Sequence, residues 1–149
     1  MAQSSAFHVR QAEEGEKFLA LDGEEYELTA EDMVIADSKK AVAIGGVMGG
    51  EDSGVTEKTT DILLESAYFL PESIRKTAKE LNINTDAKYR FERGIDPNSI
   101  KEGLEIATEL IIRICGGEAS KFNITGQASQ KNKVIDFNIK KFKDLIGIS

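Results

Sequence analysis

Hydrophobic positions in the first third of the chain recur in short runs, a pattern typical of β-strands. An Asp22-Gly23 pair separates the second run from the third, and this dipeptide tolerates the positive φ that a tight hairpin turn requires. We therefore expect a β-rich first half. The five runs are AFHV (6–9), KFLAL (17–21), EEYEL (24–28), MVIAD (33–37) and KAVAIGG (40–46).

The run DILLESAYF (61–69) has strand length and is apolar on both alternating faces, which predicts an interior strand. Within it, Glu65 is then a carboxylate drawn out of water, and such a charge needs a partner. Two partners remain open. One is an arginine such as Arg90 or Arg93 in a structural ion pair, and the other is a hydrogen-bond donor on a bound ligand.

Two later segments have helical spacing. The first begins at Pro71 and runs to Leu81, with Ile74, Ala78 and Leu81 on one stripe. The second runs from Pro97 to Cys115, where Asp96 can cap its start and Gly116-Gly117 can close its end. Its expected buried face consists of Ile100, Leu104, Ala107, Ile111 and Ile114, and its surface pair is Glu109 with Arg113.

The pattern predicts an α+β fold in which the later helices pack on a mixed sheet. We expect residues 1–5 to be a disordered or cloning-derived end and 6–125 to form the main domain, with a last strand in EASKFNITG (118–126). Residues 126–133 are expected to be a polar linker, and 134–149 the strand and helix that begin a further domain.

The net charge of −7 argues against a protein that holds nucleic acid by its overall field. The charge is unevenly distributed, however, because six cations make the middle of the chain locally positive. No membrane span or leader is visible, so a cytoplasmic protein is expected. Cys115, the single cysteine, is expected to be buried. The six cations are Arg75, Lys76, Lys79, Lys88, Arg90 and Arg93.

The glycine pairs in GGVMGG (45–50) do not have the spacing of a phosphate-binding loop or of a dinucleotide fingerprint. Two interpretations stay open: a structural turn, or a loop that lets a ligand approach backbone N–H groups. His8 is the only histidine, which disfavours a nucleophilic triad, and no metal-ligand spacing occurs. Any catalysis would depend on positioned water, backbone donors and the substrate.

The stretch GGVMGGEDSGVTEKTTDILLESAYFLPESIRKTAKELNINTDAKYRFERGIDP (45–97) closely resembles the editing domain in the β subunits of bacterial phenylalanyl-tRNA synthetases. The resemblance continues through EIATELIIRICGGEAS (105–120) and covers nearly all of the chain after residue 5. It implies an excised part of a β subunit.

The resemblance implies hydrolysis of tyrosine wrongly esterified to phenylalanine tRNA. Glu65 and the backbone of Gly46 and Gly49 would meet the tyrosine hydroxyl, while Thr85 and Ala87 would form the pocket wall. Arg90 and Arg93 are the expected contacts to the tRNA 3′ end. The resemblance further implies an α subunit as partner in an α2β2 assembly. ATP and Mg²⁺ are implied for the whole enzyme only, and the aminoacylation site is expected on the other subunit.

The chain departs from the family pattern at two places. A histidine-bearing segment expected upstream of Phe7 has no match, and His8 does not take its role. Lys88 and Tyr89 stand where relatives commonly have serine and histidine. The sequence identifies no catalytic group. Two other functions stay open: a structural or interaction module of the synthetase, and a general RNA-binding domain.

Overall fold

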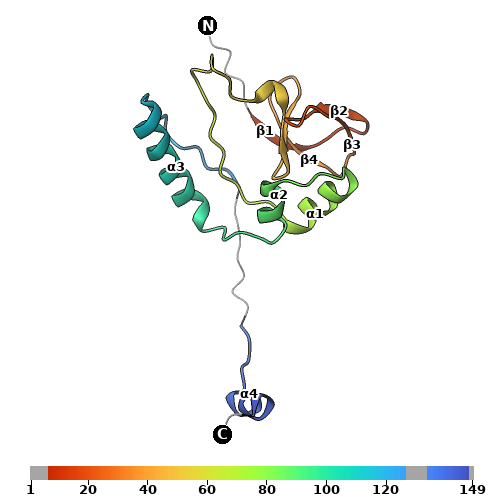
Figure 1. Ribbon diagram of the computed structural model, residues 1–149, viewed down its shortest axis with the longest axis vertical. Coiled ribbons are helices and arrows are strands. Elements are labelled where there is room, and N and C mark those ends of the chain that lie inside the picture. The colour runs from red at the N-terminus through yellow and green to blue at the C-terminus, as the bar shows by residue number, and fades with distance from the viewer. Residues whose placement is uncertain (1–6, 127–133, 148–149) are drawn as a thin grey trace.

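The computed structural model describes residues 7–126 and 134–147 (Figure 1). A β-rich body forms the first third of the chain, and helices follow it. The strands are β1 (His8–Gln11), β2 (Glu16–Leu19), β3 (Glu25–Leu28), β4 (Met33–Ala36), β5 (Ala41–Ile44) and β6 (Met48–Gly49). The helices are the 3₁₀ turn η1 (Glu51–Ser53), α1 (Pro71–Glu80), α2 (Asp86–Phe91), α3 (Ser99–Cys115) and α4 (Ile139–Ile146).

The described strands form a four-stranded sheet in the order β1-β4-β5-β6 and a separate β2–β3 hairpin. The hairpin is confirmed where the sequence predicts it, since Gly23 has φ +81° and Phe18 lies opposite Tyr26. A single bridge between Ala20 and Gly50 joins the hairpin to the sheet. The α+β class is confirmed. Both sheets are antiparallel rather than mixed, because short turns, not helical crossovers, connect most of the paired strands.

The hydrophobic core lies between these strands and α1, which together with α2 flanks the β-rich body in Figure 1. As predicted, α1 buries Ile74 and Ala78 on one stripe. Asp32 is a buried carboxylate in this core, and Thr77 of α1 donates a hydrogen bond of 2.7 Å to it. The other buried members of the core include Phe18, Leu28, Val34, Ile44, Val47 and Phe69.

The helix α3 begins at Ser99, two residues after the predicted start, and ends before Gly116, whose φ is +76°. The predicted face is only partly covered: Ile100, Leu104, Ala107 and Ile111 are half-buried, whereas Ile114 is 72% exposed. The predicted ion pair between Glu109 and Arg113 is absent among the described residues, where α3 instead pairs Lys101 with Glu105. Cys115, predicted to be buried, is exposed, as are its neighbours Ile114 and Gly116 at the end of α3.

Two strand predictions are wrong. Residues 61–69 and 118–125 are outside any strand, and 61–69 make no backbone–backbone hydrogen bond with a described residue. In Figure 1 the segment that contains 61–69 runs between α3 and the β-rich body without a neighbouring strand. A strand requires a partner for its N–H and C=O groups, and this segment has none in the described chain.

The C-terminal helix α4 is confirmed, with Asn138 as a side-chain cap that accepts from the Lys141 N–H, while 134–138 form no strand. Most of the predicted linker and all of the predicted N-terminal end fall outside the described residues, so the domain boundaries stay predictions. Among the described residues, no helix has the length and apolar character needed to cross a membrane.

Candidate functional site

The glycine loop is a tight turn that joins β5 to β6. Gly46 has φ +68°, and a Cβ at this position would lie 2.7 Å from the Phe69 ring and 2.8 Å from Ile74. A Cβ on Gly50 would lie 2.8 Å from the Val42 carbonyl. Both glycines are therefore required by backbone geometry and close packing, which supports the structural-turn interpretation.

The turn also leaves backbone groups free. Neither the N–H nor the C=O of Gly46 makes a hydrogen bond with a described residue, although the residue is half-buried. Gly49 differs, because its carbonyl accepts from the Leu21 N–H at 3.0 Å. Polar backbone groups near a protein interior normally find a partner, so the Gly46 peptide groups remain available to a ligand. The ligand-approach interpretation of the loop therefore stays open alongside the structural one.

Thr85 connects the loop to α2. Its Oγ1 donates to the Val47 carbonyl at 2.7 Å and accepts from the Lys88 N–H at 3.1 Å, which caps the helix. At the other end of α2, the ring of Phe91 meets Phe69 edge-on with centroids 5.0 Å apart. Sequence reasoning missed α2, although Thr85 before an Asp-Ala pair is a helix-start signal. Ala87, half-buried, lies in the first turn of this helix.

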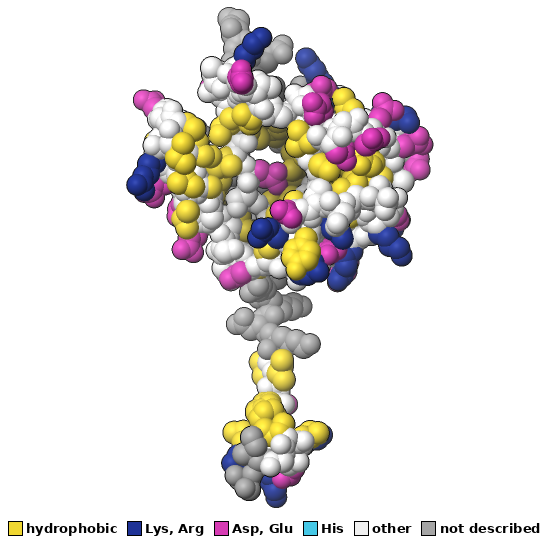
Figure 2. Space-filling model, in the orientation of Figure 1, with side chains coloured by type: hydrophobic (Ala, Val, Ile, Leu, Met, Phe, Trp, Pro, Cys, Tyr) yellow, Lys and Arg dark blue, Asp and Glu magenta, His cyan; other side chains and the backbone are white. Residues whose placement is uncertain are grey.

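Glu65 lies in the segment between α3 and the β-rich body, where Figure 2 shows a hollow with acidic side chains on its floor. Its side chain is exposed rather than interior, so the predicted burial is wrong. Neighbouring protein still displaces water from the carboxyl, and this desolvation raises its pKa. Glu65 forms no ion pair and no hydrogen bond with any described residue.

This finding removes the structural pairing of Glu65 with Arg90 or Arg93. Arg93 instead bonds to Glu92 and to the Tyr89 carbonyl, each at 2.7 Å. Of the predicted tyrosyl-site residues, Thr85 bonds to the turn that contains Gly46, through the carbonyl of Val47. Among the described residues, no hydrogen bond joins Glu65 to Gly46, Gly49 or Ala87, so their joint role stays a prediction.

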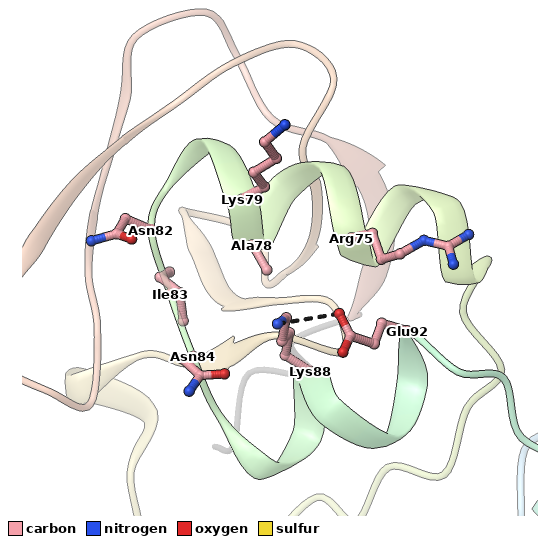
Figure 3. Close-up of a pocket in the computed structure, with 8 residues that line it drawn as sticks. All are labelled: Arg75, Ala78, Lys79, Asn82, Ile83, Asn84, Lys88 and Glu92. Atoms are coloured by element: carbon pink, nitrogen blue, oxygen red, sulfur yellow. Dashed lines mark ion pairs between the residues drawn. The ribbon is translucent and has the colours of Figure 1, made fainter.

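A cleft of about 410 Å³ lies between α1 and α2, and none of the five predicted tyrosyl-site residues lines it (Figure 3). Three of its side chains are cationic and one, Glu92, is acidic, and Lys88 pairs with that carboxylate at 3.2 Å. The cleft is lined by Arg75, Ala78, Lys79, Asn82, Ile83, Asn84, Lys88 and Glu92.

A second, shallower cleft of about 440 Å³ lies between α3 and Phe122 and is mainly apolar. Within 7–126 and 134–147, no group of three or more His, Cys, Asp or Glu side chains is arranged to hold a metal ion. The ATP and Mg²⁺ implied for a whole enzyme stay expectations about that enzyme.

Comparison with known proteins identifies the family of this domain. The profile of the B3/4 domain matches residues 2–116, and the chain belongs to the B3/4 domain family. It is 48% identical over 140 residues to the phenylalanine--tRNA ligase beta subunit of Mesorhizobium japonicum, covering 94% of this chain and 18% of the relative. The corresponding subunit of Brucella suis is 47% identical, with 94% of this chain and 17% of the relative covered.

A third relative, the phenylalanine--tRNA ligase beta subunit of Bradyrhizobium diazoefficiens, is 47% identical over the same share of this chain and 18% of its own length. The resemblance drawn from the sequence is thereby confirmed. The chain spans less than a fifth of the length of these relatives. The activity and partners of a whole ligase accordingly belong to the proposal that follows.

Proposed function

We propose that this chain is the part of a phenylalanine--tRNA ligase β subunit that hydrolyses tyrosine wrongly esterified to phenylalanine tRNA. The observation that carries the proposal is Glu65, a partly desolvated carboxylate with a raised pKa and no partner among the described residues. Such a group gains most from a ligand that brings its own hydrogen-bond donor. The phenolic hydroxyl of tyrosine is a donor of this kind.

The physics of discrimination fits this role. Tyrosine and phenylalanine differ by one hydroxyl, and an apolar pocket rejects an added hydroxyl only weakly. A site that hydrogen-bonds the hydroxyl selects tyrosine much more strongly, because phenylalanine would leave the carboxylate desolvated and unpaired. Glu65 supplies the acceptor, and the N–H of Gly46, which bonds to no described residue, supplies a backbone donor.

The remaining predicted residues act as supports in this proposal. Thr85 fixes α2 to the glycine turn through its 2.7 Å bond to Val47, and Ala87 leaves space for the ring because its side chain is small. No residue of the chain is assigned as a general base. Water held by backbone donors, with the substrate's own groups, completes the hydrolysis. In this proposal an α subunit supplies the aminoacylation site. The assembly of α and β subunits holds the tRNA body.

The exposed apolar residues of 61–64 and α3 favour one other candidate, a module that packs against the rest of the subunit without activity of its own. Ile62, Leu63 and Leu110 are each more than half exposed. Under this candidate the chain binds neither amino acid. A titration with free tyrosine and free phenylalanine distinguishes the two functions.

The test is an NMR titration of the chain with free tyrosine and free phenylalanine. We expect tyrosine to shift the amides of Gly46, Glu65 and Ala87, and phenylalanine to bind at least about tenfold more weakly. Glu65→Gln should weaken the preference, because an amide oxygen accepts a hydrogen bond less strongly than a carboxylate. The far-UV circular dichroism should stay unchanged, since Glu65 holds no partner in the described fold. The matched control is Glu57→Gln, an exposed carboxylate of the same type in the preceding loop.

Equal binding of the two amino acids, or a tyrosine preference that Glu65→Gln leaves unchanged, would overturn the role given to this residue. Release of tyrosine from mischarged tRNA by the chain, measured with radiolabelled tyrosine, then tests hydrolysis itself. A chain that prefers tyrosine but releases none would show a binding site without catalysis.

A further inference from the structure

The segment that carries Glu65 changes from exposed to anchored at Ser66. Residues 61–65 are all exposed, 66–68 are half-buried, and Phe69 is buried in the core. The Phe69 ring packs edge-on against Phe91, with centroids 5.0 Å apart. The segment is therefore held by the fold from Ser66 onward, and Glu65 is the last residue on its exposed side.

Ser66 joins this segment to α3. Its Oγ donates to the Ile100 carbonyl, in the first turn of the helix, at 2.9 Å. Within the described chain, this is the only hydrogen bond of residues 62–69, and the only one from α3 to a residue outside 96–116. One turn further along α3, a Cβ on Gly103 would lie 3.9 Å from the Ser66 Oγ. The hydrogen-bonded connection between α3 and the segment thus depends on one hydroxyl.

The position of the Glu65 carboxyl depends on its neighbour. Adjacent Cα atoms are only about 3.8 Å apart, so a bond that fixes Ser66 also restricts the backbone from which Glu65 projects. Neighbouring protein raises the pKa of Glu65 by desolvation, and a carboxyl on an unanchored segment would instead turn towards water. A carboxyl that is already fixed also loses less conformational freedom when a ligand binds.

We propose that Ser66 is a positioning residue, whose bond to Ile100 holds the Glu65 carboxyl in the hollow between α3 and the β-rich body, where a ligand's hydrogen-bond donor can reach it. Helix α3 then influences the site through Ser66. The inference rests on the proposed function in one respect, the identity of that ligand as a tyrosyl group. The positioning of Glu65 can be measured without any ligand.

The test compares Ser66→Ala and Ser66→Thr with the parent chain. The pKa of Glu65 is followed by the NMR shift of its ¹³C-labelled carboxyl, and the ratio of tyrosine to phenylalanine affinity by amide titration. Ser66→Ala should move the pKa down towards the ordinary 4.5 and lower the affinity ratio about fivefold. Ser66→Thr keeps the hydroxyl donor and should retain both parental values.

Thr108→Val is the matched control. Thr108 also donates to a carbonyl of α3, that of Leu104 at 2.7 Å, but this bond lies within the helix. The control should change neither the Glu65 pKa nor the affinity ratio. Urea unfolding and circular dichroism of each variant measure stability separately, because a residue that only supports the fold would change stability without moving the Glu65 pKa.

Four results would overturn the positioning role. They are an unchanged Glu65 pKa in Ser66→Ala, a loss in Ser66→Thr as large as that in Ser66→Ala, a parent chain whose Glu65 titrates at the ordinary value, and an equal change in Thr108→Val. The last result would assign the effect to α3 in general rather than to the bond between Ser66 and Ile100.

The two proposals fail separately. If the parent prefers tyrosine and Ser66→Ala changes neither the Glu65 pKa nor the preference, the positioning role is wrong and the editing site stands. A Glu65 pKa that falls in Ser66→Ala, in a chain without tyrosine preference, supports the positioning role and overturns the proposed function.

Discussion

Thr77 and Asp32 lie 45 residues apart in the sequence and meet in the core through a hydrogen bond of 2.7 Å. The threonine belongs to α1, and Asp32 precedes β4, so the bond ties the helix to the sheet. The Thr29 N–H donates to the second carboxylate oxygen at 2.9 Å. Together these bonds satisfy a carboxylate that is only 1% exposed.

Replacing Thr77 by valine should destabilise the fold by about 1–3 kcal/mol, because it removes a donor from a buried carboxylate while keeping the shape of the side chain. Urea unfolding followed by circular dichroism measures the change. Thr60→Val is the matched control, since Thr60 donates a 2.9 Å bond to Asp61 at an exposed position. Equal stability losses in the two variants would contradict a special contribution from burial.

Glycine-to-alanine changes should have opposite effects at two positions. Gly50→Ala should be strongly destabilising, by more than about 1 kcal/mol, since the new Cβ would lie 2.8 Å from the Val42 carbonyl. Gly103→Ala, inside α3, should stabilise by about 0.5–1 kcal/mol, because the nearest atom is 3.9 Å away and alanine favours helix. Thermal unfolding of both variants tests this, and a stable Gly50→Ala would show that the turn can relax.

The bonds of Thr85 predict a local effect on α2. Thr85→Val removes both the cap of the helix and its bond to Val47, and should cost about 1–2 kcal/mol. Thr85→Ser keeps the hydroxyl and should retain most of the stability. Hydrogen exchange at the Lys88 amide should be faster in the valine variant, since that amide loses its acceptor. Unchanged exchange at Lys88 would mean that Thr85 does not hold the helix.

The ion pair of Arg10 with Glu16 predicts a pH dependence of stability. The hydrogen bonds from Arg10, at 2.7 and 2.8 Å, hold the Glu16 pKa at about 2, below its ordinary 4.5. Because the folded pKa is the lower one, this contribution is complete above pH 4.5 and is lost as the pH falls towards 2. Stability measured by urea unfolding should fall less steeply in this range for Arg10→Ala than for the parent.

The control for this prediction is the double variant with Arg10→Ala and Glu16→Gln. It should have the same shallow pH dependence as Glu16→Gln alone, since the titrating group is gone in both. A slope in Arg10→Ala as steep as that of the parent would assign the acid sensitivity to other carboxylates.

The similarity to synthetase β subunits could be recognised from sequence motifs, because Glu65, Gly46 and Thr85 lie in recognisable stretches. The positions of these three residues relative to one another could not be predicted from the motifs. The sequence shows Glu65 in a run that is apolar on both alternating faces and so predicts burial, but the side chain is exposed and partly desolvated. Burial depends on what covers a segment, and the alternation of residues carries no information on whether a neighbour is present.

Local signals in the sequence determined β2 to β5, the turn at Gly23, and the helices α1, α3 and α4, because helices and hairpins satisfy their hydrogen bonds with nearby residues. The run that forms β1 was also readable, although its partner β4 is distant in the sequence. Tertiary structure alone decided the rest. Residues 61–69 have strand composition without strand structure, since their hydrogen bonds require a distant partner. Helix α2 is too short for its pattern to identify it, and contacts of Thr85 and Phe91 with the β5–β6 turn and Phe69 hold it in place.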